Sequence, residues 1–251
     1  MYQQYPLFVR CDGALCAHYS DPLHILFIGN SYTHTNNLPH MFDKLSTSGG
    51  HPVDVEASAR SGFTLHDHLG AFRTRRKLTK KHWDFVILQE QSVVPSVRNK
   101  RKQLMYPAAR SLEHEIEALG ADVIFFMTWG RRDGLPKAGH RDFITMQMQL
   151  YYGYLSIARE LGATVAPVGL AWEEELAQDP APDLWDLDGT HPSTKGSYLA
   201  ACVFYAVIYQ QSPEGLHYTA GISRETARRL QRIAAETVLG DPGYWNMHET
   251  A

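Results

Sequence analysis

The stretch that decides the fold is residues 24–33, which read HILFIGNSYT. Residues 26–28 form a short apolar run, which is typical of a strand buried on both faces of a parallel sheet. Residues 29–31, Gly-Asn-Ser, then break the run, and glycine permits a sharp turn directly after the strand. Ser31 is therefore expected at the carboxyl end of the first strand, the edge at which open α/β sheets bind their ligands.

Further apolar runs predict four more strands, and helical patterns lie between them. The expected strands are residues 52–57, 83–89, 122–127 and 164–167. The expected helices are residues 38–45, 63–80, 102–119, 141–161, 168–177, 195–210 and 224–239, the first with Asn37 as its N-cap and Pro39 in its first turn. This alternation predicts an α/β fold: a three-layer α/β/α sandwich around a mostly parallel five-stranded sheet, flavodoxin-like in type. We expect one domain over residues 23–251, preceded by an N-terminal arm, residues 1–22.

Composition narrows the classes of function. The 251 residues are 44% hydrophobic and 20% charged, as in ordinary soluble proteins, and the net charge of -3 gives no support for nucleic-acid binding. The basic cluster at residues 73–77, with Lys80 and Lys81, is interpreted as a solvated helix face. Cys11, Cys16 and Cys202 are too few for a disulfide scaffold and are expected to be reduced. No signal-peptide pattern and no apolar run of ~18 residues is present, which predicts a cytoplasmic protein without a membrane span.

The segment 186–193, DLDGTHPS, can supply the partners that a nucleophilic serine requires. A serine needs a base near neutral pH, and a carboxylate on the far nitrogen of a histidine fixes its tautomer. Asp188 and His191, three residues apart across a Gly-Thr turn, can converge without long-range placement. The alternative is a polar turn before a helix, with His191 merely near the helix N-cap.

Three of these features together resemble the SGNH hydrolases, the GDSL esterase/lipase superfamily. They are Ser31 in a GNS motif after the first strand, Gly62 after the second, and Asp188-Gly-Thr-His191 near the C-terminus. The order of serine, aspartate and histidine is also that family's, and no G-x-S-x-G motif of the α/β-hydrolase fold is present. The chain is similar to a subgroup with GNS and QEQS motifs.

The resemblance implies a role for each matched residue. Ser31 would be the nucleophile, His191 the general base and Asp188 its orienter, and the backbone N–H groups of Ser31 and Gly62 would form an oxyanion hole. The family's third motif, G-x-N-D, supplies an asparagine donor, but residues 89–92 read QEQS here. A glutamine amide carries the same donor, so Gln89 or Gln91 could replace it, and strand register decides which.

Further polar and aromatic residues lie at the predicted strand ends. Asn30, which stands where the family has aspartate, Glu90 and Trp129 are expected in the substrate pocket. Trp129 could equally be a buried anchor, and Glu90 could pair with Arg60 or Arg131. Residues 66–68, His-Asp-His, are interpreted as solvated surface rather than as a metal site, since positions i and i+2 of a helix face apart. We expect no cofactor and no metal.

The function implied by the resemblance is a serine esterase that acts through an acyl-enzyme. Its substrate would be a small-molecule or carbohydrate ester, with a small acyl group such as acetyl. Two alternatives stay open: an acyltransferase, and a non-catalytic relative that binds carbohydrate or an acylated ligand. A metal-dependent phosphoesterase is disfavoured because it would need carboxylates and histidines clustered at several strand ends, and the sequence offers Asp188 and His191 in one segment. The sequence does not predict the oligomeric state.

Overall fold

The structure is a computed structural model that describes residues 22–179 and 183–247. The predicted arm, residues 1–22, and with it Cys11 and Cys16, lies outside the described residues apart from Pro22. Five parallel strands form one sheet in the order β2-β1-β3-β4-β5. They are β1 (Leu23–Gly29), β2 (Val53–Ala59), β3 (Phe85–Leu88), β4 (Asp122–Phe126) and β5 (Thr164–Ala166). The predicted fold class is confirmed, and within the described residues the sheet is entirely parallel.

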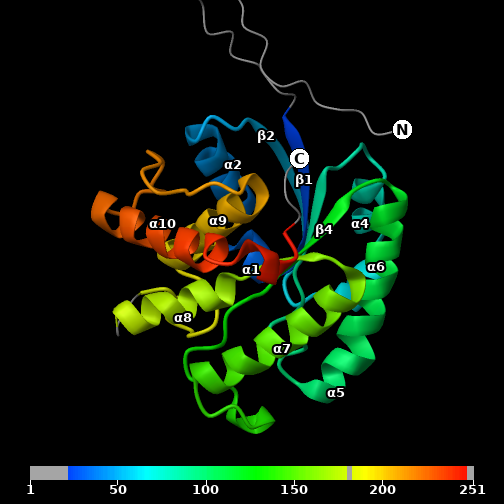
Figure 1. Cartoon of the computed structure of the whole chain (residues 1–251). Coiled ribbons are helices and arrows are strands. Elements are labelled where there is room, and N and C mark those ends of the chain that lie inside the picture. Colours follow the sequence, from blue (N-terminus) through cyan, green and yellow to red (C-terminus); the bar gives the residue numbers. More distant parts are fainter. Residues whose placement is uncertain (1–21, 180–182, 248–251) are drawn as a thin grey trace, which may run out of the picture.

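Helices cover both faces of this sheet (Figure 1). Their bounds are α1 (Ser31–His34), α2 (Leu38–Ser48), α3 (Leu65–Leu69), α4 (Phe72–Leu78), α5 (Arg98–Lys100), α6 (Tyr106–Ala118), α7 (Phe143–Leu161), α8 (Val168–Gln178), α9 (Thr194–Tyr209) and α10 (Arg224–Leu239). One layer contains α2 and α9, with α8 and α10 packed against α9, and the other contains α3, α4, α6 and α7. Short η turns span Thr35–Asn37, Pro136–Ala138 and Pro242–Trp245, and a π-turn, Arg101–Met105, leads into α6.

The core explains why β1 and α9 lie at the centre. Phe27 of β1 packs edge-on against Phe42 of α2 and Phe204 of α9, with ring centroids 6.2 and 5.3 Å apart. α9 is buried from Gly196 to Ile208 without interruption, as expected of a helix that is apolar on every side. This packing holds the segment that follows β1, residues 30–37, at the carboxyl edge of the sheet.

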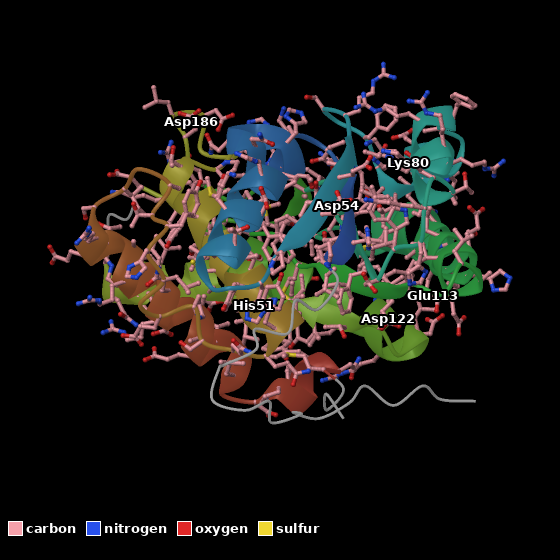
Figure 2. The ribbon with its side chains drawn as sticks, turned by 90° about the horizontal axis from the view of Figure 1, so that it is seen from above. His51, Asp54, Lys80, Glu113, Asp122 and Asp186 are labelled. Atoms are coloured by element: carbon pink, nitrogen blue, oxygen red, sulfur yellow. The ribbon has the colours of Figure 1, made fainter. Side chains whose placement is uncertain are left out.

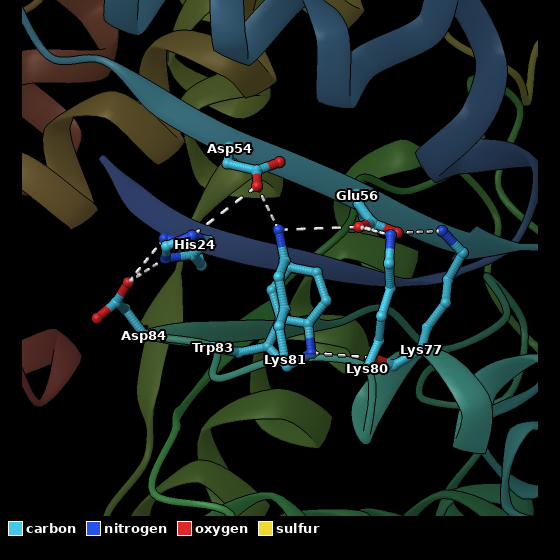
Figure 3. Close-up of polar contacts among 8 residues, drawn as sticks. All are labelled: His24, Asp54, Glu56, Lys77, Lys80, Lys81, Trp83 and Asp84. Atoms are coloured by element: carbon cyan, nitrogen blue, oxygen red, sulfur yellow. Dashed lines mark hydrogen bonds and ion pairs between the residues drawn. The ribbon is translucent and has the colours of Figure 1, made fainter. Parts of the chain in front are cut away.

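The arginines of the basic cluster, Arg73, Arg75 and Arg76, are exposed as predicted, but its lysines are paired with acids. Lys77 and Lys80 each donate to Glu56 at 2.6 Å, and Lys81 bonds Asp54, as Figure 3 shows. These acids lie two residues apart on β2, the edge strand, so their side chains stand on the same face of the sheet. Figure 2 shows Lys80 toward the right of the view and Asp186 toward the left.

Two further local expectations are wrong. His68 of the His-Asp-His segment is only 2% exposed, because both of its ring nitrogens bond inside the protein. Asn37 has a left-handed backbone and makes no side-chain cap, so the chain enters α2 through the turn Thr35–Asn37 instead. Across the described ranges, no group of three or more metal-ligating side chains could hold an ion. No helix of the described part is long and apolar enough to cross a membrane.

Candidate active site

Ser31 is the first residue of α1, directly after the N-cap Asn30. The side chain of Asn30 accepts a hydrogen bond from the Tyr32 amide at 3.1 Å and donates one to the Phe63 carbonyl at 2.9 Å. One end of this side chain thus satisfies an orphan amide of the first helical turn, and the other holds the loop after β2. The serine is therefore presented at the carboxyl edge of the sheet, as predicted, but with no loop between strand and helix.

The structure brings Ser31, His191 and Asp188 together. His191 Nε2 lies 2.9 Å from Ser31 Oγ, and His191 Nδ1 lies 2.5 Å from Asp188 Oδ2. The carboxylate can only accept, so Nδ1 carries the proton and Nε2 is left as the acceptor that faces the serine hydroxyl. Gly189, at φ +66°, forms the turn that lets the aspartate fold back onto the histidine.

The Asp188 carboxylate is held in its ionised form. Its Oδ1 accepts bonds from the amides of Thr190 and His191, both at 2.9 Å. Burial raises the pKa of this carboxyl, but the bonds from the His191 side chain and from the two amides outweigh it and lower the pKa to about 2. Asp188 is therefore a carboxylate at any physiological pH and can stabilise positive charge on His191.

The loop after β2 places Gly62 beside the same turn. The Arg60 amide donates to the Gly29 carbonyl at 3.2 Å, and Asn30 holds Phe63 on the other side. Gly62 has φ +77° and open space where a Cβ would stand. Among the residues that the structure describes, neither the Gly62 amide nor the Ser31 amide donates to a protein acceptor. Both remain available to a ligand.

The two candidate glutamines differ sharply. Gln89 is fully buried: its Oε1 accepts from the Asn30 amide at 2.8 Å and from Thr33 Oγ1 at 2.9 Å, and its Nε2 donates to the Glu90 carbonyl. The prediction that Gln89 could reach the oxyanion is therefore wrong, because the side chain is fully buried and one of its two amide N–H groups already donates to the Glu90 carbonyl. Gln91 is half-buried, and only its Oε1 is engaged, by the Val93 amide. Its amide N–H groups have no acceptor in the described residues.

The residues expected in the substrate pocket lie beneath the site instead. Asn30 is 2% exposed, and Glu90 and Trp129 are not exposed at all, so these three do not line a pocket. Glu90 pairs with no arginine in the described chain. Its Oε1 accepts from the Leu65 amide at 3.2 Å and the Gln91 amide at 2.6 Å. Burial raises the pKa of Glu90 to about 8, which makes it a neutral acid at pH 7.

An aromatic stack behind His191 was not found from the sequence. Tyr32 packs face to face on Trp129, with centroids 4.6 Å apart, and edge-on to the His191 ring at 5.7 Å. The Tyr32 hydroxyl bonds Thr190 Oγ1 at 2.7 Å, and Trp129 Nε1 donates to the Thr190 carbonyl. The stack therefore fixes the loop that carries His191. The only signal in the sequence was a tyrosine directly after the candidate nucleophile.

His68 was also missed, and it supports the turn from below. The Gly29 carbonyl can only accept, so His68 Nε2 carries the proton that it receives at 2.8 Å, while Nδ1 accepts from Thr74 Oγ1 at 2.7 Å. Burial lowers the pKa of His68, which favours this neutral form. A buried, neutral histidine thus fixes the carbonyl of the residue two positions before Ser31.

The fold and the three bonded side chains define a flavodoxin-like α/β protein with a serine-histidine-aspartate constellation at its ligand-binding edge. A protein from Slackia heliotrinireducens described as an SGNH hydrolase is 30% identical, with a TM-score of 0.63 over 73% of this chain and 97% of its own. The chain belongs to the SGNH hydrolase family.

Two further solved structures share the fold at lower identity. A DUF4886 family protein from Bacteroides uniformis has a TM-score of 0.72 at 18% identity, over 87% of this chain and 95% of that one. Axe2, an acetylxylan esterase from Geobacillus stearothermophilus, has a TM-score of 0.58 at 20% identity, over 80% and 97%. A scan of protein-family models and a search of curated proteins give no match.

Proposed function

We propose that this chain is a serine esterase that hydrolyses carboxylic esters of small acyl groups through an acyl-enzyme. The observation that carries the proposal is the continuous hydrogen-bonded series from Asp188 through His191 to Ser31 Oγ. A purely structural serine would not require a neutral imidazole nitrogen facing its hydroxyl and a carboxylate on the far nitrogen. Membership of the SGNH hydrolases supports the same reaction class. We further assign the chain to a subgroup marked by GNS and QEQS motifs.

In the proposed reaction Ser31 Oγ attacks the ester carbonyl carbon while its proton moves to His191 Nε2. The tetrahedral intermediate collapses, the acyl group stays on Ser31, and His191 returns the proton to the leaving alcohol. Water then attacks the acyl-enzyme with His191 again as base, and the carboxylic acid and free serine are released. Asp188, ionised throughout, stabilises the imidazolium in both steps.

The negative charge on the former carbonyl oxygen needs fixed donors. The free amides of Ser31 and Gly62 supply two, and the Ser31 amide also belongs to the first turn of α1, whose orphan N–H groups favour an anion. Gln91 Nε2 is the third donor that we assign. Each donor of this kind contributes roughly 3 kcal/mol to the lowering of the barrier.

Hydrolysis is favoured over acyl transfer by exposure at the site. The side chains of His191 and Asp188 are 36% and 46% exposed, so water reaches the base freely. An enzyme that passes its acyl group to another alcohol must exclude water from the acyl-enzyme. One protein that shares the fold, Axe2, is an acetylxylan esterase, and this likeness is the support for the proposed acetyl group.

The test is the hydrolysis of p-nitrophenyl acetate, butyrate and octanoate by the wild type and by Ser31→Ala. We expect activity that falls with chain length and drops by at least three orders of magnitude in Ser31→Ala. The matched control is Ser61→Ala, which removes an exposed hydroxyl that bonds His34 and not His191. Labelling of Ser31 by a fluorophosphonate separates an enzyme from a non-catalytic relative. Equal trace activity in both proteins, without labelling, would refute the proposal.

A further inference from the structure

A hollow of about 650 Å³ lies between the end of β2, the loop that follows it, α3 and the start of α4. Its floor is polar and fully bonded. Ser58 Oγ lies 3.0 Å from Thr74 Oγ1, which bonds His68 Nδ1, and His68 Nε2 donates to the Gly29 carbonyl. The floor is thus tied by side-chain bonds to the turn that carries Ser31. The same loop that forms one wall also carries Gly62.

The walls of the hollow expose aromatic rings and arginines. Phe72, the first residue of α4, is 78% exposed, which is unusual for so large an apolar side chain. Arg60 stacks its guanidinium over the Phe63 ring at 4.7 Å. In the described chain, no hydrogen bond or ion pair engages the guanidinium N–H groups of Arg60. A flat apolar ring beside a cation with free donors fits a sugar ring that carries an acidic group.

The charges of the hollow are not neutralised. In the described chain, Arg60 and Arg73, both exposed wall residues, lie within ion-pair distance of no carboxylate. The neighbouring lysines behave oppositely, since Lys77, Lys80 and Lys81 are all paired with acids of β2 (Figure 3). The one acidic wall residue among the described ones, Asp67, is turned to its own helix cap.

Asp67 can offset only one of the two positive charges of the hollow. Its Oδ2 accepts from the Thr64 amide at 2.8 Å and from Thr64 Oγ1 at 2.7 Å. These bonds form a capping box at the start of α3 and lower the pKa of Asp67, so its carboxylate stays ionised and is turned toward the helix cap. The two arginines are therefore left facing solvent with net positive charge, next to the loop that carries a candidate oxyanion donor.

We propose that this hollow is an anion subsite that binds the carboxylate of an acylated acidic sugar while the ester of that sugar lies over Ser31. The inference rests on the proposed esterase function and names the class of its substrate. The planar, forked donors of Arg60 and Arg73 match a carboxylate, and Phe72 offers its ring to the apolar face of the sugar.

The first test compares two substrates that differ only in charge: the O-acetylated methyl glycosides of glucuronic acid and of glucose. We expect kcat/KM to be about tenfold higher for the uronate, as for one charge-assisted hydrogen bond at an exposed site. The preference should fall toward one in 1 M NaCl, where charges are screened beyond about 3 Å. Equal kcat/KM for the two substrates at low salt would overturn the subsite.

The variants Arg73→Ala and Arg73→Lys test the assigned residue. We expect the uronate preference to disappear in Arg73→Ala and to persist in part in Arg73→Lys, which keeps the charge but loses the fork. Arg228→Ala, an exposed arginine of α10 on the other layer, is the matched control and should keep the full preference. An Arg73→Ala protein with an unchanged preference would refute the assignment.

A binding measurement separates this inference from the proposed function. Saturation-transfer NMR with the unacetylated methyl glucuronide requires no catalysis, and it should show binding to the wild-type chain that is lost in Arg73→Ala. Such binding without any Ser31-dependent hydrolysis would support the proposed subsite and refute the proposed esterase function. Ser31-dependent hydrolysis of p-nitrophenyl acetate, with no glucuronide binding and no charge preference, would leave the esterase and remove the subsite.

Discussion

Replacing Glu90 by glutamine should make the protein more stable at alkaline pH than the wild type. Glu90 is fully buried, and its Oε2 has no hydrogen-bond partner among the described residues. No cation neutralises it, and the Coulomb repulsion of Asp67 adds to the burial that raises its pKa to about 8. Glutamine keeps the acceptor for the amides of Leu65 and Gln91 and cannot ionise.

The magnitude follows from linkage. The folded protein holds the proton of Glu90 up to a pKa of about 8, whereas the unfolded chain releases it at 4.5. Between these values the folded state binds one more proton, so the free energy of unfolding falls as pH rises, by about 1.4 kcal/mol per pH unit. The stability contributed by the neutral carboxyl is fully present below pH 4.5. It is lost by about pH 8, a total of roughly 5 kcal/mol.

The assay is urea unfolding of wild type and Glu90→Gln at intervals from pH 5 to pH 9, followed by tryptophan fluorescence. We expect the difference in unfolding free energy between the two proteins to move in favour of Glu90→Gln by several kcal/mol across this range. Glu214→Gln, an exposed glutamate, is the control and should track the wild type. A constant difference between wild type and Glu90→Gln from pH 5 to pH 8.5 would refute a neutral, buried Glu90.

Three further substitutions test the site and the residues beneath it. Asp188→Asn should lower kcat on p-nitrophenyl acetate by ~10²–10⁴ at pH 7, because the histidine loses the partner that fixes its tautomer; Asp186→Asn in the same loop is the control, and a loss of less than tenfold in Asp188→Asn would contradict the role. Gln91→Ala should lower kcat by ~10²–10³ with little change in the free energy of unfolding. Gln89→Ala should instead lower the free energy of unfolding by about 1–3 kcal/mol, because it leaves the buried Asn30 amide without a hydrogen-bond acceptor. If Gln91→Ala destabilises the fold and keeps kcat, the donor assignment is wrong.

The fold and the constellation could be predicted because each depends on local pattern. Apolar runs that alternate with helical patterns predict a parallel α/β sheet. The turn that brings Asp188 to His191 closes within four residues. Ser31 needed only its place after a buried strand. In each case the information lies within one stretch of sequence, and the parallel sheet then brings the ends of separate strands to one edge.

The wrong predictions concern side chains whose burial depends on partners that are distant in the sequence. Polar residues after a strand were predicted to face a ligand, yet the side chains of Asn30, Gln89 and Glu90 all bond backbone groups beneath the site. The alternation of strand faces ends at Leu88, so no period could tell Gln89 from Gln91. His68 was misplaced for the same reason, because its partner is the Gly29 carbonyl, 39 residues earlier in the chain.

The GNS motif follows from this buried layer. The Asn30 side chain must accept from the Tyr32 amide and at the same time donate to the Phe63 carbonyl, which a carboxylate cannot do. An ionised group at this position would also lie close to Gln89 and a buried Glu90 in a region of low dielectric. With asparagine at 30, a neutral acid at 90 and a neutral imidazole at 68, the layer below Ser31 carries no net charge. No charged group of this layer then opposes the Asp188 carboxylate. The positive charge that develops on the His191 imidazole is stabilised by Asp188.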